Sequence, residues 1–226
     1  NVTMPCKNAI VPLCDRLSTA AQISGAVNTI VIEKDKTITG HTTDGAGFFL
    51  SCREEGFDIK GKKMVILGSG GAGTAILVQA ALDGAEAISV FIRSNSAFLE
   101  RTCQVVEQLQ IQTKCKIRIL DYQEPLLKQE IHSSQLLVNS TNIGMAPKIQ
   151  ECLIPDASYF HPELTVADII YNPLETRLVT MAKEAGCRAF GGSYMLLFQG
   201  AESFRLWTGK EMPVELIKKN LFSKSN

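Results

Sequence analysis

A glycine-rich turn between an apolar run and an alanine-rich segment constrains this chain more than any other feature. Residues 62–67 form a short apolar run typical of a strand, and residues 74–82 favour a helix. Between them, Gly68, Gly70 and Gly73 match the spacing G-x-G-x-x-G, which lets the backbone approach a pyrophosphate closely. The pattern predicts a dinucleotide-binding domain, and a glycine turn with a purely structural role is the alternative.

Strands alternate with helices along the rest of this region. Further strands are expected at residues 88–92, 116–120, 136–139 and 164–170, and further helices at residues 98–109, 124–130 and 175–185. This alternation is typical of parallel strands joined by helical crossovers. We therefore predict an α/β fold with a doubly wound parallel sheet, of the Rossmann kind.

The first fifty residues have a different pattern. Two short strands at residues 27–33 and 37–41 flank a tight connection, and a helix at residues 44–54 leads into the glycine turn. Two more helices are expected after Gly192 and after Pro213. The predicted division is a smaller α/β substrate domain at residues 1–50, joined by helices within residues 196–226, and a dinucleotide-binding domain at residues 51–195.

Composition excludes several classes of partner. The 23 basic residues balance the 23 acidic ones, so the chain lacks the positive charge that nucleic-acid binding requires. No apolar run approaches the ~18 residues of a membrane span, and no signal peptide is visible. The seven cysteines are scattered and never form a metal-ligand spacing. We expect a cytoplasmic protein with reduced thiols, and with no metal, membrane or nucleic-acid partner.

The end of the second expected strand bears on the choice of dinucleotide. An acidic residue there holds the ribose of NAD, whereas a basic residue favours the extra phosphate of NADP. This chain has Arg93 and Asn95 at that place. Arg93 could hold the phosphate or stack on adenine, or it could be an ordinary solvated side chain, so the residues alone leave NAD and NADP open.

Oxidation of an alcohol by a nicotinamide requires a side chain that takes the hydroxyl proton. Lys7, after Pro5, and Asp44, before Gly45, are polar residues at expected loop positions and are candidates for this role. Taken alone, each of them is more simply explained as an ordinary surface charge.

A series of motifs narrows these alternatives. The chain contains NVTMPCK at residues 1–7, GAVNT at 25–29, GHTTDG at 40–45, NSTNIGM at 139–145, YNP at 171–173, and MLLFQGAESF at 195–204 followed by WTG at 207–209. In this order the motifs resemble those of the shikimate dehydrogenase family, most closely its quinate/shikimate dehydrogenase branch. The resemblance covers nearly the whole chain.

The resemblance implies a role for each matched position. Lys7 would be the acid/base and Asp44 would fix it, while the nicotinamide cofactor would be NAD or NADP, with a lean to NAD. The ring hydroxyls of shikimate or quinate would bond to Thr3, Asn28 and Gln199. The pyrophosphate would lie on Ser69, Gly70, Gly71 and Ala72, the adenosine end on Arg93 and Asn95, and the nicotinamide end on Asn142, Ile169, Tyr171 and Gly192. Packing at the sheet edge is the alternative for these last four, and a homodimer is a further expectation.

Two departures from the family pattern affect the interpretation. Thr42 stands where the family usually has Asn, which removes one amide but keeps the Asp44 carboxylate. The family also carries a segment before the first motif, with serines that hold the substrate carboxylate, so we expect the chain to be truncated at its N-terminus. The alternatives to a shikimate or quinate dehydrogenase are a non-catalytic ligand sensor and a relative acting on another small polyhydroxy acid. A sensor would need neither Lys7 nor Asp44.

Overall fold

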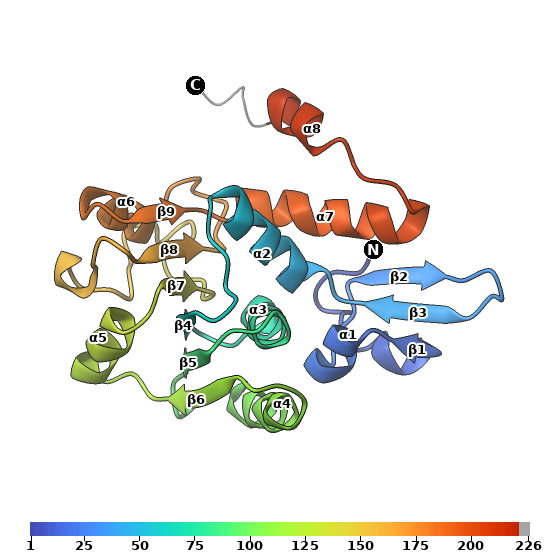
Figure 1. Cartoon of the computed structure of the whole chain (residues 1–226), viewed down its shortest axis with the longest axis horizontal. Helices are drawn as coiled ribbons and strands as arrows, with labels where there is room; N and C mark the ends of the chain where they lie inside the picture. The colour runs from blue at the N-terminus through green and yellow to red at the C-terminus, as the bar shows by residue number, and fades with distance from the viewer. Residues whose placement is uncertain (222–226) are drawn as a thin grey trace.

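The expected parallel sheet is present and has the predicted topology. The computed structural model describes residues 1–221 and contains a six-stranded sheet in the order β6-β5-β4-β7-β8-β9 (Figure 1). Its strands are β4 (Lys63–Leu67), β5 (Ala87–Phe91), β6 (Lys116–Leu120), β7 (Leu136–Asn139), β8 (Thr165–Asp168) and β9 (Arg188–Phe190). All neighbouring pairs are parallel. The chain runs outward from β4 to β6 and returns to place β7 beside β4, so a topological switch point lies between β4 and β7.

Helices cover both faces of this sheet, which confirms the doubly wound arrangement. The helices α3 (Gly71–Leu82) and α4 (Leu99–Gln112) lie on one face, and α5 (Glu124–His132) and α6 (Arg177–Glu184) on the other (Figure 1). Strand β4 shows the alternation, because Met64 and Ile66 belong to the first core and Val65 and Leu67 to the second. Both faces are therefore apolar, as expected for a parallel sheet between helices.

A second, smaller sheet is built from the first part of the chain. It has the order β1-β3-β2, from β1 (Arg16–Leu17), β2 (Thr29–Ile32) and β3 (Ile38–His41). Strands β2 and β3 form the expected antiparallel hairpin, and β1 runs parallel to β3. The 3-10 helix η1 (Val11–Leu13) and the helix α1 (Thr19–Ser24) precede the hairpin. This small sheet with its helix confirms that the first part of the chain forms a smaller α/β region. The division into domains at residues 50 and 195 stays a prediction.

Some elements differ from the sequence prediction. The strands β1 and β9 and the helix α1 were not predicted, because two or three paired residues leave no periodic pattern and α1 is short. Ser18 and Gly25 cap α1 at its two ends and were a legible signal that was missed. The strand expected at residues 164–170 ends at Asp168, because the Ile170 N–H turns back to the Asp168 carboxylate.

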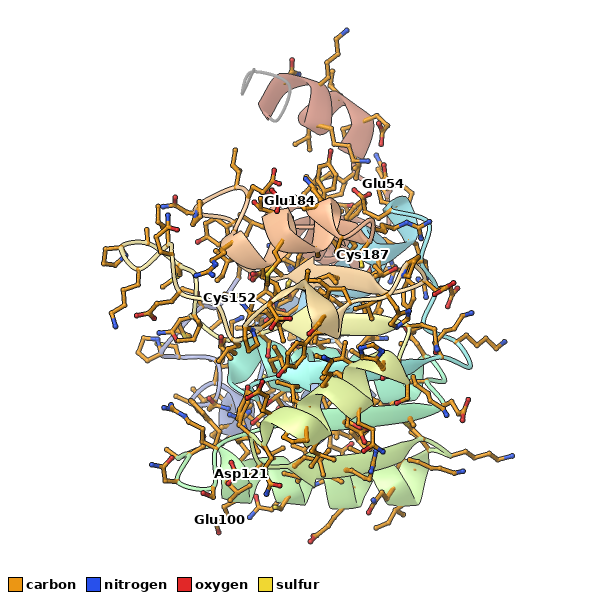
Figure 2. All side chains as sticks on the ribbon, turned by 90° about the vertical axis from the view of Figure 1, so that its left-hand side faces the viewer. Glu54, Glu100, Asp121, Cys152, Glu184 and Cys187 are labelled. Atoms are coloured by element: carbon orange, nitrogen blue, oxygen red, sulfur yellow. The ribbon has the colours of Figure 1, made fainter. Side chains whose placement is uncertain are left out.

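The seven cysteines form no disulfide in the structure. Cys52, Cys115 and Cys187 are buried, and burial raises the pKa of Cys115 to about 11. Figure 2 shows Cys187 within the packed side chains of the sheet and helices, whereas Asp121 lies at the periphery. In the part of the chain that the structure describes, no helix is long and apolar enough to cross a membrane.

A helix between the two sheets packs against two other helices. The helix α2 (Asp44–Glu54) has the predicted bounds and packs against both α3 and α7 (Ser193–Thr208), and α8 (Val214–Leu221) follows α7 (Figure 1). Glycines permit this close packing. A Cβ built on Gly45 would lie 2.3 Å from the carbonyl oxygen of Ala75 on α3, and one built on Gly47 would lie 2.4 Å from the backbone nitrogen of Gln199 on α7.

The substitution Gly47→Ala should destabilise the fold by about 1–3 kcal/mol, because the added methyl group must push α2 and α7 apart. Gly200→Ala is the matched control, since a Cβ there meets no atom within 4 Å. It should stabilise by about 0.4–1 kcal/mol through the unfolded chain. Urea unfolding of both variants measures the difference, and similar free energies for the two would contradict the role of Gly47.

Candidate active site

The first residues of the chain run beside the start of β2 and are held there by the backbone. The Val2 N–H donates to the Asn28 carbonyl oxygen at 2.6 Å, and the Val27 N–H donates to the Lys7 carbonyl oxygen at 2.9 Å. The Asn8 side chain donates to the Gly25 carbonyl oxygen at 2.6 Å. These bonds place Lys7 close to Asn28, at the end of the small sheet where β2 begins.

Lys7 and Asp44 form an ion pair, as the resemblance predicted. Lys7 Nζ donates to Asp44 Oδ2 at 2.6 Å, and the two side chains are 23% and 13% exposed. Asp44 is the first residue of α2, where the positive end of the helix dipole favours a carboxylate. The pair is therefore largely shielded from solvent.

Asn28 and Gln199 complete the polar group around Asp44. Asn28 Nδ2 donates to Asp44 Oδ1 at 2.8 Å, and it lies 3.5 Å from Gln199 Oε1. Gln199 belongs to α7, and its own Nε2 donates to the Leu196 carbonyl oxygen. Residues far apart in sequence thus converge on one carboxylate, with each of its oxygens accepting a different donor.

This group lines a cleft at the carboxyl edge of the large sheet. A cavity of about 320 Å³ is lined by Asn1, Val2, Thr3, Lys7, Asn28, Asp44, Ala72, Ile169, Tyr171, Gly192, Met195, Leu196 and Gln199. An adjoining cavity of about 560 Å³ shares Thr3, Lys7, Ala72, Ile169 and Tyr171 and adds Met4, Gly71, Ser140, Thr141, Asn142, Met145, Ala146, Ile170 and Asn172. Together they extend from the Lys7–Asp44 pair to the glycine turn at the switch point, where ligands of such sheets bind.

The glycine turn fits a pyrophosphate. Gly68 has a φ of +88°, and a Cβ on Gly73 would lie 2.4 Å from Ser140 Oγ, so both positions require glycine. A Cβ on Gly70 or Gly71 would meet no atom within 4 Å, which leaves an open cradle above the turn. The helix α3 begins there without a side-chain cap, and its first N–H groups have no intrahelical partner.

Three predicted nucleotide residues need closer description. Ser69 is buried and its Oγ lies 2.7 Å from Thr102 Oγ1, so only its backbone faces the cradle. Arg93 and Asn95 follow β5 at the same sheet edge, with exposed side chains outside the two cavities. Burial raises the pKa of Tyr122 to about 12, and the nearby positive charge of Arg93 acts against that rise.

A buried carboxylate that the sequence reasoning missed holds the loops at the other end of the cleft. Asp168 accepts from Asn139 Nδ2 at 3.1 Å, from the Ile170 N–H at 3.0 Å and from Thr176 Oγ1 at 2.8 Å. Burial raises the pKa of Asp168, and these donors act in the opposite direction. The bonds join the loops that carry Asn142 and Ile169. An acidic residue within an otherwise apolar run was the available signal.

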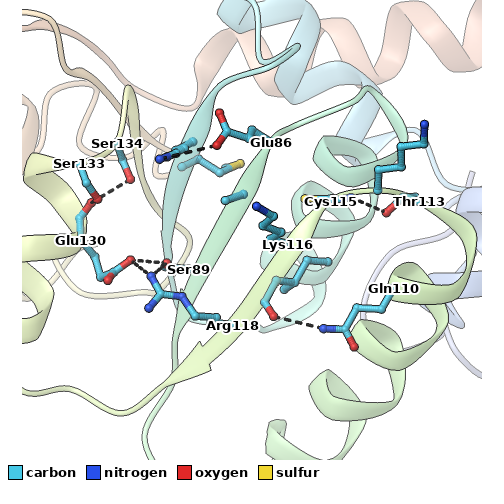
Figure 3. Close-up of a pocket in the computed structure, with 15 residues that line it drawn as sticks. Glu86, Ser89, Gln110, Thr113, Cys115, Lys116, Arg118, Glu130, Ser133 and Ser134 are labelled. Carbon is cyan, nitrogen blue, oxygen red and sulfur yellow. Dashed lines mark hydrogen bonds and ion pairs between the residues drawn. The ribbon is translucent and has the colours of Figure 1, made fainter.

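Another cavity of about 550 Å³ lies at the opposite end of the large sheet (Figure 3). Its buried Glu130 carboxylate accepts from Ser89 Oγ at 2.6 Å and pairs with Arg118. Lys63 and Glu86 pair at 3.6 Å. None of the predicted site residues lines this cavity. The predicted site residues therefore lie at the carboxyl edge of the sheet and not at this opposite end.

Comparison with known proteins agrees with this geometry. Residues 1–30 match the model of the shikimate dehydrogenase substrate binding domain, and residues 192–222 match that of the shikimate 5'-dehydrogenase C-terminal domain. A shikimate dehydrogenase (NADP(+)) of Listeria innocua is 46% identical over 98% of this chain and 76% of its own length. A quinate/shikimate dehydrogenase of Escherichia coli is 41% identical over 96% of this chain and 75% of its own length.

The chain belongs to the shikimate dehydrogenase family. A crystal structure of shikimate 5-dehydrogenase from Listeria monocytogenes, in complex with shikimate and NAD, superposes with a TM-score of 0.94. That protein is 46% identical, and the match covers 98% of this chain and 76% of the other. The resemblance seen in the sequence motifs is thereby confirmed.

The substitution Gly70→Val should weaken nucleotide binding by roughly tenfold or more, because the side chain would occupy the open cradle. Folding should be retained, since a Cβ at Gly70 contacts no atom within 4 Å. Calorimetric titration with NAD and NADP measures the loss. Gly200→Val adds the same side chain at another open position and should bind normally, whereas equal affinity in both variants would make the glycine turn purely structural.

Proposed function

We propose that this chain catalyses the reversible oxidation of the ring 3-hydroxyl of shikimate or quinate with a nicotinamide dinucleotide. The Lys7–Asp44 ion pair carries this proposal, because it stands in the wall of a cavity that extends to the glycine turn. A nicotinamide bound along that cleft supplies the group that accepts or returns a hydride. The relatives named above support the same reaction class.

Lys7 acts on the proton of the reacting hydroxyl. Its neutral amine takes this proton as the alcohol is oxidised, and the resulting ammonium returns it when the ketone is reduced. Asp44 directs Nζ into the cavity through the 2.6 Å contact. Because this contact already orients Nζ, the orientation of the acid/base costs little when the substrate binds.

The remaining cavity residues suit the rest of the substrate and the nicotinamide. Thr3, Asn28 and Gln199 offer hydrogen-bonding groups to the ring hydroxyls. The nicotinamide end would lie near Asn142, Ile169, Tyr171 and Gly192. A Cβ on Gly192 would lie 2.0 Å from the Ile169 carbonyl oxygen, so the start of α7 packs directly on the loop after β8 and closes this end of the cleft.

Steady-state assays with shikimate and quinate, each with NAD and NADP, test the proposal. Turnover with one of the two acids is the expected result. Saturable binding without turnover would support a ligand sensor, and turnover only with another polyhydroxy acid would support a different substrate. The Lys7–Asp44 pair favours the enzyme over the sensor, because a sensor has no use for an acid/base.

The variant Lys7→Met should lower kcat on the order of a hundredfold or more, because the acid/base is lost. Affinity for NAD or NADP should change little, since the glycine turn is intact. Lys60→Met, at an exposed lysine, is the control and should keep full turnover. Unchanged kcat in Lys7→Met would remove Lys7 from the catalytic role.

For the dinucleotide, we infer that both NAD and NADP serve. The exposed Arg93 can attract a 2′-phosphate, but its charge is solvated and screened before the phosphate arrives. The shikimate dehydrogenase of Listeria innocua is named for NADP(+), which does not support the expected preference for NAD. The Listeria monocytogenes crystal structure, in contrast, contains NAD. The values of kcat/KM measured with NAD and with NADP should differ by less than roughly a thousandfold, or about 4 kcal/mol. A larger difference would mean that other residues determine the choice of dinucleotide.

The homodimer and the cytoplasmic location stay predictions.

A further inference from the structure

Behind Asp44 lies a closed ring of side-chain hydrogen bonds that the proposed mechanism does not use. Its four members are almost completely buried, at 2%, 0%, 1% and 0% exposure respectively: Asn28, Thr29, Thr43 and Ser203. They come from the start of β2, the residue before α2 and the middle of α7. The ring therefore joins the three segments that carry Asn28, Asp44 and Gln199.

One placement of the hydrogens lets every hydroxyl in the ring donate once and accept once. Asn28 Nδ2 donates to Thr43 Oγ1 at 2.9 Å, and Thr43 donates to Ser203 Oγ at 3.2 Å. Ser203 then donates to Thr29 Oγ1 at 2.7 Å, and Thr29 donates to Asn28 Oδ1 at 2.9 Å. The Asn28 amide sets the direction, because its nitrogen can only donate and its oxygen can only accept. Such a closed chain strengthens each of its bonds.

Two contacts outside the ring decide which way the Asn28 amide faces. Asn28 Oδ1 accepts a second bond from the Thr43 N–H at 2.9 Å, and the second Nδ2 hydrogen is directed at Asp44 Oδ1 at 2.8 Å. A flipped amide would place its oxygen against the Asp44 carboxylate and its NH₂ group against the Thr43 N–H. Both contacts would be repulsive, so the observed orientation is strongly preferred.

Ser203 ties this arrangement to α7. Its hydroxyl has a second acceptor within reach, the carbonyl oxygen of Gln199 at 2.9 Å, one turn earlier on the helix. Because a hydroxyl has one hydrogen, Ser203 donates either to this oxygen or to Thr29 Oγ1. At the level of Gln199, α7 packs directly on Gly47 of α2. The position of α7 along α2 is thus determined both by backbone packing and by the ring.

We propose that Thr29 and Ser203 are positioning residues for the catalytic pair. Through the ring they hold the Asn28 amide so that it donates to Asp44 Oδ1, which leaves Asp44 Oδ2 facing Lys7. Neither residue lines the two cavities, so they act through Asn28 rather than on a ligand. The effect on turnover rests on the function proposed above, whereas the orientation of Asn28 does not.

A matched pair of variants at Thr29 separates the hydroxyl from packing. Thr29→Val keeps the shape and removes the hydroxyl, and Thr29→Ser keeps the hydroxyl and removes a methyl group. We expect Thr29→Val to lower kcat roughly three- to tenfold with KM changed less than about twofold, and Thr29→Ser to recover most of the loss. Equal losses in the two variants would show that packing alone matters and would overturn the proposal.

A second comparison uses two buried serines. Ser203→Ala opens the ring, whereas Ser51→Ala removes a hydroxyl that donates to the Phe48 carbonyl oxygen within α2 at 2.6 Å. Ser51 is 1% exposed, which makes it a close match in burial. Ser203→Ala should lower kcat as Thr29→Val does, while Ser51→Ala should not. A similar loss in both would overturn the proposal.

A measurement without turnover keeps the two proposals separate. In ¹⁵N-labelled protein, the Asn28 side-chain amide signals are identified by their absence in Asn28→Asp, and their hydrogen exchange is measured. Exchange should be roughly tenfold faster or more in Thr29→Val and Ser203→Ala than in the wild type and Ser51→Ala. Unchanged exchange overturns the ring proposal even if the enzyme is active. An inactive wild type would overturn the proposed function only, and the amide exchange would then decide the ring proposal.

Discussion

The contact of α2 with both α3 and α7 is the constraint on which the site depends. Gly45 lets α2 approach the helix that follows the glycine turn, and Gly47 lets it approach the helix that carries Gln199. Asp44 is the first residue of α2, so this packing sets the distance from its carboxylate to both ends of the cleft. Because packed interiors have few voids, even a small change in volume at these contacts would move the carboxylate.

The second determinant is the compensation of charge around Asp44. A carboxylate with 13% side-chain exposure would be costly without partners. Here it has the Lys7 ammonium, the Asn28 amide and the dipole of α2. These same partners give the carboxylate one orientation, so the groups that make its burial tolerable also fix the position of Lys7 Nζ beside it.

The large sheet contributes the other half of the site through its topology. The turns after β4 and β7 diverge at the switch point and leave a crevice, in which the open cradle at Gly70 and Gly71 faces the loops after β7 and β8. Asp168 fixes those loops by accepting from Asn139 and Thr176. The cleft therefore has the loops joined by Asp168 on one side and the Lys7–Asp44 ion pair on the other.

The sequence by itself determined the strands β4 to β8 of the large sheet, the glycine turn and the helix α2. These features depend on local periodicity and on glycine geometry, which are visible within a few residues. The motifs also singled out Lys7, Asp44, Asn28 and Gln199, although only through resemblance to a family. The ion pair itself joins residues 37 positions apart, and no local pattern predicts that distance.

The tertiary structure decided what depends on contacts between distant segments. The strand β1 exists because it pairs with β3, and the Ser69 side chain faces Thr102 because α4 packs there. Thr29 and Ser203 are 174 positions apart, and each alone is an ordinary small polar residue. Their role arises only when folding buries both hydroxyls beside the Asn28 amide, because a buried polar group must find its partner within the protein.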